Sequence, residues 1–223
     1  MSTPSGATRQ GVRDPGAISG LLTGIAFVAA IVGAMKIAKN PIPRPGAPAE
    51  DIRTYYRDSA PAARFSVAGQ MVSILSLARF TRSVARLASS DDQSRVLPAA
   101  VRLSGTAAAA LLASSAATHG SLTVPHDRDD ETLVRTARRV FVLGGPVHGV
   151  VYGVFTGLVA KVGRHAGLLG SPLATTGYVS AAAGVLSPAY FRWENAGWLI
   201  PIGRFTGYIV GGVLGVRLAR QGG

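Results

Sequence analysis

The chain has 223 residues, of which 48% are apolar and only 15% are charged. Soluble domains carry about 25% charged residues and disordered chains are more polar still, so this composition excludes a disordered protein and indicates a membrane protein. The absence of cysteine excludes disulfide scaffolds, thiolate metal sites and cysteine nucleophiles. The formal charge of +12 comes from basic residues spread between apolar segments, where lysine and arginine typically face lipid headgroups.

The amino-terminal part predicts a flexible polar leader, a first membrane span and a long connection. Residues 1–15 are polar, and residues 16–35 then run without a charge, long enough for a helix to cross a hydrocarbon core of about 30 Å. Residues 39–64 are expected to form a loop, because four prolines open this stretch and mixed charges follow. Proline lacks a backbone N–H and favours extended geometry.

The second apolar segment allows two interpretations. Residues 65–78 are apolar but few, and Arg79, Arg82 and Arg86 then recur on one helical face. The helix is therefore either a tilted span with a basic end or an amphipathic helix in the membrane interface, with its arginines on anionic headgroups.

The remainder of the chain predicts four more apolar helices and one polar loop. The apolar segments are residues 97–118, 140–162, 166–187 and 197–218. Residues 119–139 form the polar loop, and within it residues 132–139 are expected to be an amphipathic lead-in to the next helix. The sequence thus predicts an all-α bundle of six hydrophobic helices in a single integral membrane domain over residues 1–223, with five or six of the helices spanning. Six spans would divide the basic residues almost evenly between the two sides. Five spans, with residues 65–88 in the interface, gather most of them on one side and are slightly favoured by the positive-inside rule.

Glycine recurs every four residues in three of the apolar segments. These glycines are Gly16, Gly20 and Gly24 in the first, Gly145, Gly149, Gly153 and Gly157 in the fourth, and Gly203, Gly207, Gly211 and Gly215 in the last. A spacing of four places them on one helical stripe, where missing side chains let two backbones approach closely. This pattern predicts tight helix packing, either within the bundle or against another subunit.

Three polar residues fall inside apolar segments. His148 and Arg204 are ionisable, and ionisable groups within a membrane are candidates for function. Gln70 is expected to hydrogen-bond between helices. For His148, a bond to a neighbouring helix is the simpler expectation, and Arg204 either reaches the headgroups or binds an anion.

The sequence contains no recognisable catalytic motif. It lacks a phosphate-binding loop, a dinucleotide fingerprint and a His-Glu-x-x-His pair, so neither enzyme activity nor a cofactor or metal is predicted. We expect a structural or accessory subunit of a membrane assembly, in a bacterial plasma membrane or an organelle inner membrane. Its expected partners are anionic lipids and other membrane subunits or a second copy, and not nucleic acid. The alternative is a small transporter or channel.

Overall fold

The protein is all-helical throughout the part of the chain that the computed structural model describes, residues 14–91, 95–124 and 128–221. The predicted all-α class is therefore confirmed. The helices are α1 (Ser19–Ile37), α2 (Ala49–Asp58), α3 (Ala60–Asp91), α4 (Val96–Leu122), α5 (Asp130–Val142), a π-helical turn (Leu143–Val147), α6 (His148–His165), α7 (Ser171–Leu186), two short 3-10 turns (Ser187–Phe191 and Glu194–Trp198) and α8 (Leu199–Arg220). The polar leader of residues 1–15 lies outside the described residues, except for its last two positions.

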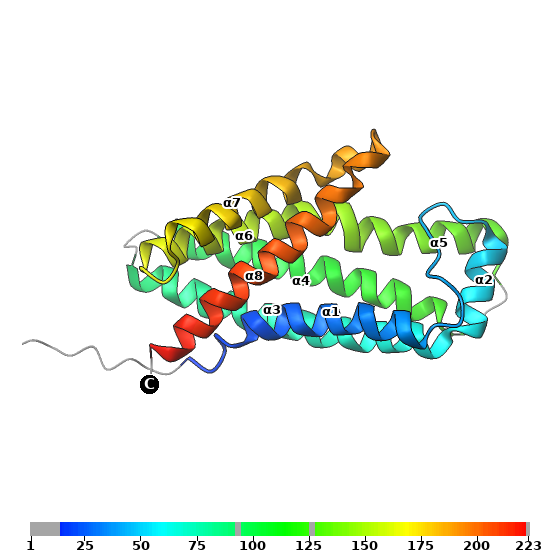
Figure 1. Cartoon of the computed structure of the whole chain (residues 1–223), viewed down its shortest axis with the longest axis horizontal. Helices are drawn as coiled ribbons and strands as arrows, with labels where there is room; N and C mark the ends of the chain where they lie inside the picture. Colours follow the sequence, from blue (N-terminus) through cyan, green and yellow to red (C-terminus); the bar gives the residue numbers. More distant parts are fainter. Residues whose placement is uncertain (1–13, 92–94, 125–127, 222–223) are drawn as a thin grey trace, which may run out of the picture.

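Six long helical passes run back and forth in the bundle (Figure 1). They are α1, α3, α4, the continuous α5–α6 helix, α7 and α8. The start of α1 lies beside the end of α8, and both are at the end of the bundle that also holds the α3–α4 and α6–α7 connections (Figure 1). We name this the terminal end, and we name the opposite end, where α2 lies, the α2 end.

Most of the residues expected to form a loop at 39–64 are helical. The stretch from Ala49 to Asp58 forms α2, with acidic residues in its first turn, where carboxylates are favoured by the helix dipole. Ile52 and Tyr55 are each only 2% exposed and lie three residues apart on one helical face. Ile52 packs with Leu122 and Leu133 in a small core of its own, so burial of one apolar face outweighs the charged composition.

The loop predicted at 119–139 is also too long. Helix α4 continues to Leu122, and α5 begins at Asp130 after a cap in which Asp129 accepts a hydrogen bond from the N–H of Thr132 at 2.8 Å. Aspartate at such a cap pairs one of the N–H groups that the first helical turn leaves open. The amphipathic α5 is thus the outer part of the same helix as α6.

Within the described residues, four helical stretches, not six, are long and apolar enough to cross a membrane: Ser19–Ile37, Val96–Leu122, Asp130–His165 and Glu194–Arg220. The other two predicted spans fall short for different reasons. Helix α7 has only 16 residues before the chain tightens into a 3-10 turn at Ser187. In α3 the apolar part is short because Arg64 and Arg79 flank it.

Helix α3 belongs to the bundle and does not lie across its end. It runs between α1 and α4 (Figure 1), and its Ser73 Oγ donates a hydrogen bond to the carbonyl of Thr23 at 2.9 Å. Near the terminal end, Phe80 and Val84 are buried in the common core. Helix α3 therefore packs along α1 and α4 as a member of the bundle.

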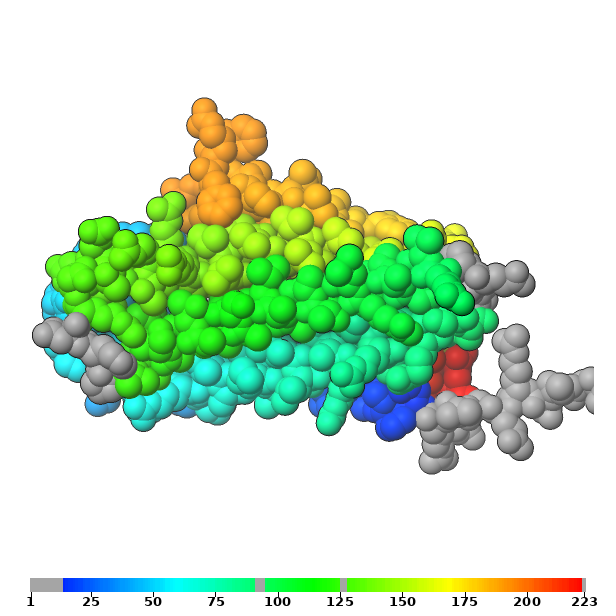
Figure 2. Space-filling model, turned by 180° about the vertical axis from the view of Figure 1, so that it is seen from behind, coloured from blue at the N-terminus to red at the C-terminus, as the bar shows by residue number. Residues whose placement is uncertain are grey.

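The middle of the bundle is closed. Rings of Phe27, Phe80, Tyr152, Phe155 and Tyr208 meet there edge-on or tilted, at centroid distances of 5.6–6.2 Å. A cavity among these rings measures only about 10 Å³. From behind, α4 lies between α3 and the α5–α6 helix in an unbroken surface, while the turn between α7 and α8 stands out from the bundle (Figure 2).

Candidate functional site

The first glycine series lies at the contact between α1 and α8. A Cβ on Gly20 would lie 2.5 Å from the carbonyl oxygen of Gly211, and one on Gly215 would meet the carbonyl of Ala17. Gly24 faces the Tyr208 side chain, with 2.8 Å for a Cβ, and Gly16 faces Ser83 Oγ on α3. The two backbones therefore approach more closely than any side chain would permit.

The second glycine series holds α6 against α7. Gly149 and Gly153 lie against the backbone of Gly184, and a Cβ on Gly184 would lie 2.6 Å from the Gly149 carbonyl oxygen. Gly157 faces Ala181 at 3.1 Å, whereas the nearest atom to Gly145, at 3.5 Å, belongs to Phe141 of the same helix. Gly184 is central to this contact, although it belongs to no regular glycine series, so the sequence pattern did not single it out.

The third series is shared between two contacts. A Cβ on Gly203 would lie 2.8 Å from the backbone nitrogen of Gly184. Gly207 lies against Tyr152 and Thr156 of α6. Gly211 lies against Phe80 of α3, and Gly215 lies against Ala17 and Gly20 at the start of α1. Apart from Gly145, the glycines of the three series thus lie against neighbouring segments of the same chain.

His148 and Arg204 form one polar cluster in the bundle. An Arg204 Nη donates a hydrogen bond to Nδ1 of His148 at 3.1 Å and another to the carbonyl of Gly144. The guanidinium also lies 4.9 Å from the centre of the Phe27 ring, a favourable cation–π position. His148 is 1% exposed and stacks on Tyr152, and its Nε2 has no hydrogen-bond partner.

The cluster is built around the π-helical turn. Pro146 has no N–H to donate to the preceding turn, and such a bulge frees carbonyls for other partners. Three other segments supply them: Ser115 Oγ donates to the Val140 carbonyl at 2.8 Å, Arg204 to Gly144, and Ser187 Oγ to the Pro146 carbonyl at 3.0 Å. The sequence showed His148 and Arg204 as separate candidates, and the fold brings them together.

Along the long axis of the bundle, Arg204 of α8 lies level with the middle of α1 and not with either end of that helix. The ring that it covers, Phe27, is near the middle of the Ser19–Ile37 stretch. No carboxylate among the described residues lies within ion-pair distance of Arg204, which is partly exposed. The cluster is therefore a cation whose counter-charge is missing from the described chain.

The remaining predicted site residues lie apart from this cluster. Gln70 donates to Ser66 of its own helix at 3.3 Å and not to another helix, and its Oε1 is buried without a partner. Arg79, Arg82 and Arg86 are exposed near the terminal end. Arg86 pairs with Asp14 at 2.8 Å. Burial alone would raise the pKa of Asp14, but hydrogen bonds from Arg86, Ser83 and the Gly16 N–H outweigh it and leave the pKa below its usual value.

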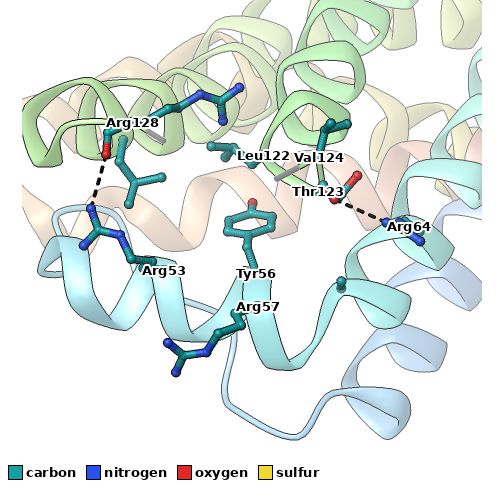
Figure 3. Close-up of a pocket in the computed structure, with 10 residues that line it drawn as sticks. Arg53, Tyr56, Arg57, Arg64, Leu122, Thr123, Val124 and Arg128 are labelled. Carbon is teal, nitrogen blue, oxygen red and sulfur yellow. Dashed lines mark hydrogen bonds between the residues drawn. The ribbon is translucent and has the colours of Figure 1, made fainter. Parts of the chain in front are cut away.

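A second site, which the sequence analysis missed, lies at the α2 end (Figure 3). A pocket of about 290 Å³ opens between α2, the start of α3 and the α4–α5 connection; its lining includes Arg53, Tyr56, Arg57, Arg64, Leu122, Thr123, Val124 and Arg128. Its arginines come from three separate segments, so only the arrival of α2 beside the end of α4 gathers them. The edge-on contact of Tyr56 with His119, at 5.8 Å between ring centres, holds the phenol upright in the pocket. Burial raises the pKa of this tyrosine.

Neither site resembles a metal centre. The described residues hold no group of three histidine, aspartate or glutamate side chains placed to bind a metal ion. Comparisons with protein-family models, with curated proteins and with solved structures found no significant match.

Proposed function

We propose that the protein is a non-enzymatic accessory subunit of a membrane assembly, and that Arg204 is its docking point for a partner helix. In this proposal six helices cross the membrane, because α3 and α7 pack antiparallel between helices that are long and apolar enough to span. The glycine stripes then build the subunit itself, and the contact with a partner uses another feature.

The observation that carries the proposal is the unpaired guanidinium of Arg204 halfway along α1. A charged side chain near the centre of a bilayer costs several kcal/mol, and such residues are normally paired. The carbonyl of Gly144, the ring of Phe27 and Nδ1 of His148 solvate the cation but do not neutralise it. A carboxylate on a transmembrane helix of another subunit would supply the missing charge at this depth.

A transporter or channel for an unknown solute is the second candidate. The π-helical turn and the cation beside it favour this alternative, because broken helices and buried charges line many transport sites. The closed middle of the bundle, with its void of about 10 Å³, supports the accessory function instead.

Isolation of the protein in mild detergent tests the proposal. We expect a stoichiometric membrane partner with an acidic residue in one of its spans. Arg204→Leu should release that partner, whereas Arg204→Lys should retain it, and Arg102→Leu, which removes an exposed charge from α4, serves as the matched control.

Exchange of the two charges between the subunits is the decisive experiment. Arg204→Asp combined with arginine at the acidic position of the partner should restore the complex, even if Arg204→Leu alone lowers the stability of the subunit. A partner that remains bound to Arg204→Leu would contradict the proposal. So would a protein that purifies alone and whose melting temperature rises with an anionic solute unless Arg204 is replaced, which would establish the transport alternative.

A further inference from the structure

We propose that the pocket at the α2 end binds the phosphate of an anionic phospholipid. Arg53, Arg57, Arg64 and Arg128 are among the residues that line the pocket. The hydroxyl of Tyr56 points towards Leu122 and Thr123 (Figure 3). Arginine suits phosphate because its planar fork presents several N–H donors together with a permanent charge.

Two of the four arginines keep their charge without a carboxylate. Arg64 donates to the carbonyl of Thr123 at 3.4 Å, and Arg128 donates to the carbonyl of Ser121 at 3.0 Å. No described carboxylate pairs with either side chain. Each bond to a carbonyl uses one Nη, so the remaining N–H groups are left to bind an anion.

The other two arginines are already paired. Arg53 contacts Asp130 at 2.7 Å and Arg57 contacts Asp58 at 3.0 Å. The hydrogen bond from Arg57 lowers the pKa of the Asp58 carboxyl and outweighs the opposing effect of burial, so the pair stays charged at neutral pH. We therefore assign phosphate binding to Arg64 and Arg128, with Tyr56 as a further donor.

The position of the pocket favours a lipid over a free anion. Leu122 is the last residue of the apolar stretch Val96–Leu122, so the pocket lies where that stretch ends and the headgroup region begins. Ala60, Leu122, Val124 and Leu133 also line the pocket and give it apolar surface beside the arginines. Apolar side chains beside two arginines match the glycerol backbone and the phosphate of a lipid. Basic pockets between helices at this depth bind anionic headgroups.

This assignment differs from the one that the sequence favours. Arg79, Arg82 and Arg86 lie at the terminal end on an exposed helix face, and Arg86 is paired with Asp14. Exposed cations attract any anionic surface but enclose no ligand. The two groups of arginines therefore make a matched comparison, because one group lines a pocket and the other lies on an open helix face.

Titration of the purified full-length protein with phosphatidylglycerol in detergent micelles tests the proposal, with the melting temperature as the readout. We expect the melting temperature to rise with phosphatidylglycerol and not with phosphatidylcholine. Arg64→Gln combined with Arg128→Gln should weaken the apparent affinity about tenfold or more, the equivalent of one charge-assisted hydrogen bond. The matched pair Arg79→Gln and Arg82→Gln removes the same charge and should leave the affinity unchanged.

A variant that keeps every arginine guards against a loss of folding. Ala60→Phe places a ring at the pocket wall and should also weaken the response to phosphatidylglycerol. The proposal is overturned if both arginine pairs weaken the response equally, since the effect would then be general charge attraction. It is also overturned if inorganic phosphate alone gives the full rise in melting temperature, because the ligand would then be the free anion.

Discussion

The contact between α1 and α8 and the contact between α2 and the α4–α5 connection follow opposite principles. In the first, glycines bring two backbones together so closely that a single added carbon at Gly20 would lie 2.5 Å from a carbonyl oxygen. In the second, arginines and tyrosine hold the segments apart around a pocket of about 290 Å³. Close backbone packing tolerates no addition, whereas long polar side chains leave space for a ligand.

The antiparallel contact of α1 with α8 predicts that the two chain ends lie on the same side of the membrane. Because Ala17 lies beside Gly215, both chain ends leave the bundle at the terminal end. Cysteines introduced at Ser5 and Gln221 of this cysteine-free chain should therefore react with an impermeant reagent from the same side of the membrane. Labelling from opposite sides would refute six crossings and restore the interfacial placement of α3.

Alanine substitutions within the glycine contact should separate positions that look equivalent in the sequence. Gly20→Ala should lower the free energy of unfolding by about 2–3 kcal/mol, because the backbone of α8 blocks the new methyl group. Gly211→Ala should be neutral or slightly stabilising, since its nearest neighbour is a Phe80 ring carbon at 3.4 Å and alanine favours a helix. Denaturation of both variants in mixed micelles measures the difference, and equal losses would contradict the packing described.

Asp14 next to the glycine contact gives an effect that depends on pH. Asp14→Asn should lower the free energy of unfolding by only about 1 kcal/mol at neutral pH, because Arg86 is largely exposed and solvent weakens the ion pair. The native pKa of Asp14 lies below its ordinary value of 3.8, so its contribution is complete above that value and is lost as the pH falls through the native pKa. The gap in melting temperature between wild type and variant should be constant from about pH 7 to pH 5 and should close in stronger acid. A gap that persists there would rule out the carboxylate as its source.

The pocket should tolerate what the glycine contact does not. Ala60→Phe adds a whole ring beside the pocket, yet we expect the free energy of unfolding without lipid to change by less than about 1 kcal/mol, because the ring enters existing space. The same denaturation experiment compares it with Gly20→Ala. A larger loss for Ala60→Phe would mean that the α2 end is as tightly packed as the α1–α8 contact.

The sequence predicted the helical class and most apolar helices, because charge-free runs of sufficient length have few other solutions in a membrane. It failed at α2, where the spacing of Ile52 and Tyr55 was the available signal but prolines and charges obscured it. It also failed to predict the length of α3, since hydropathy alone cannot show that α1 and α4 cover its polar positions.

The sites were harder to predict than the helices. His148 and Arg204 are far apart in the chain, and their meeting depends on the register that Gly184 sets between α6, α7 and α8. The pocket depends on α2 returning to the end of α4, where Arg53 meets the Arg128 carbonyl and Asp130. No local pattern encodes such long-range register.

The continuous helix from Asp130 to His165 has 36 residues and is therefore about 54 Å long. A hydrocarbon core of about 30 Å covers little more than half of that length, so an upright α5–α6 helix extends from the membrane by about the length of α5. Its protruding end begins beside the basic pocket, and its π-helical turn presents the carbonyl that holds Arg204. One continuous helix thus contributes Asp130 to the contact with Arg53 beside the pocket and, farther along, the Gly144 carbonyl that accepts from Arg204, so the two sites share a single rod.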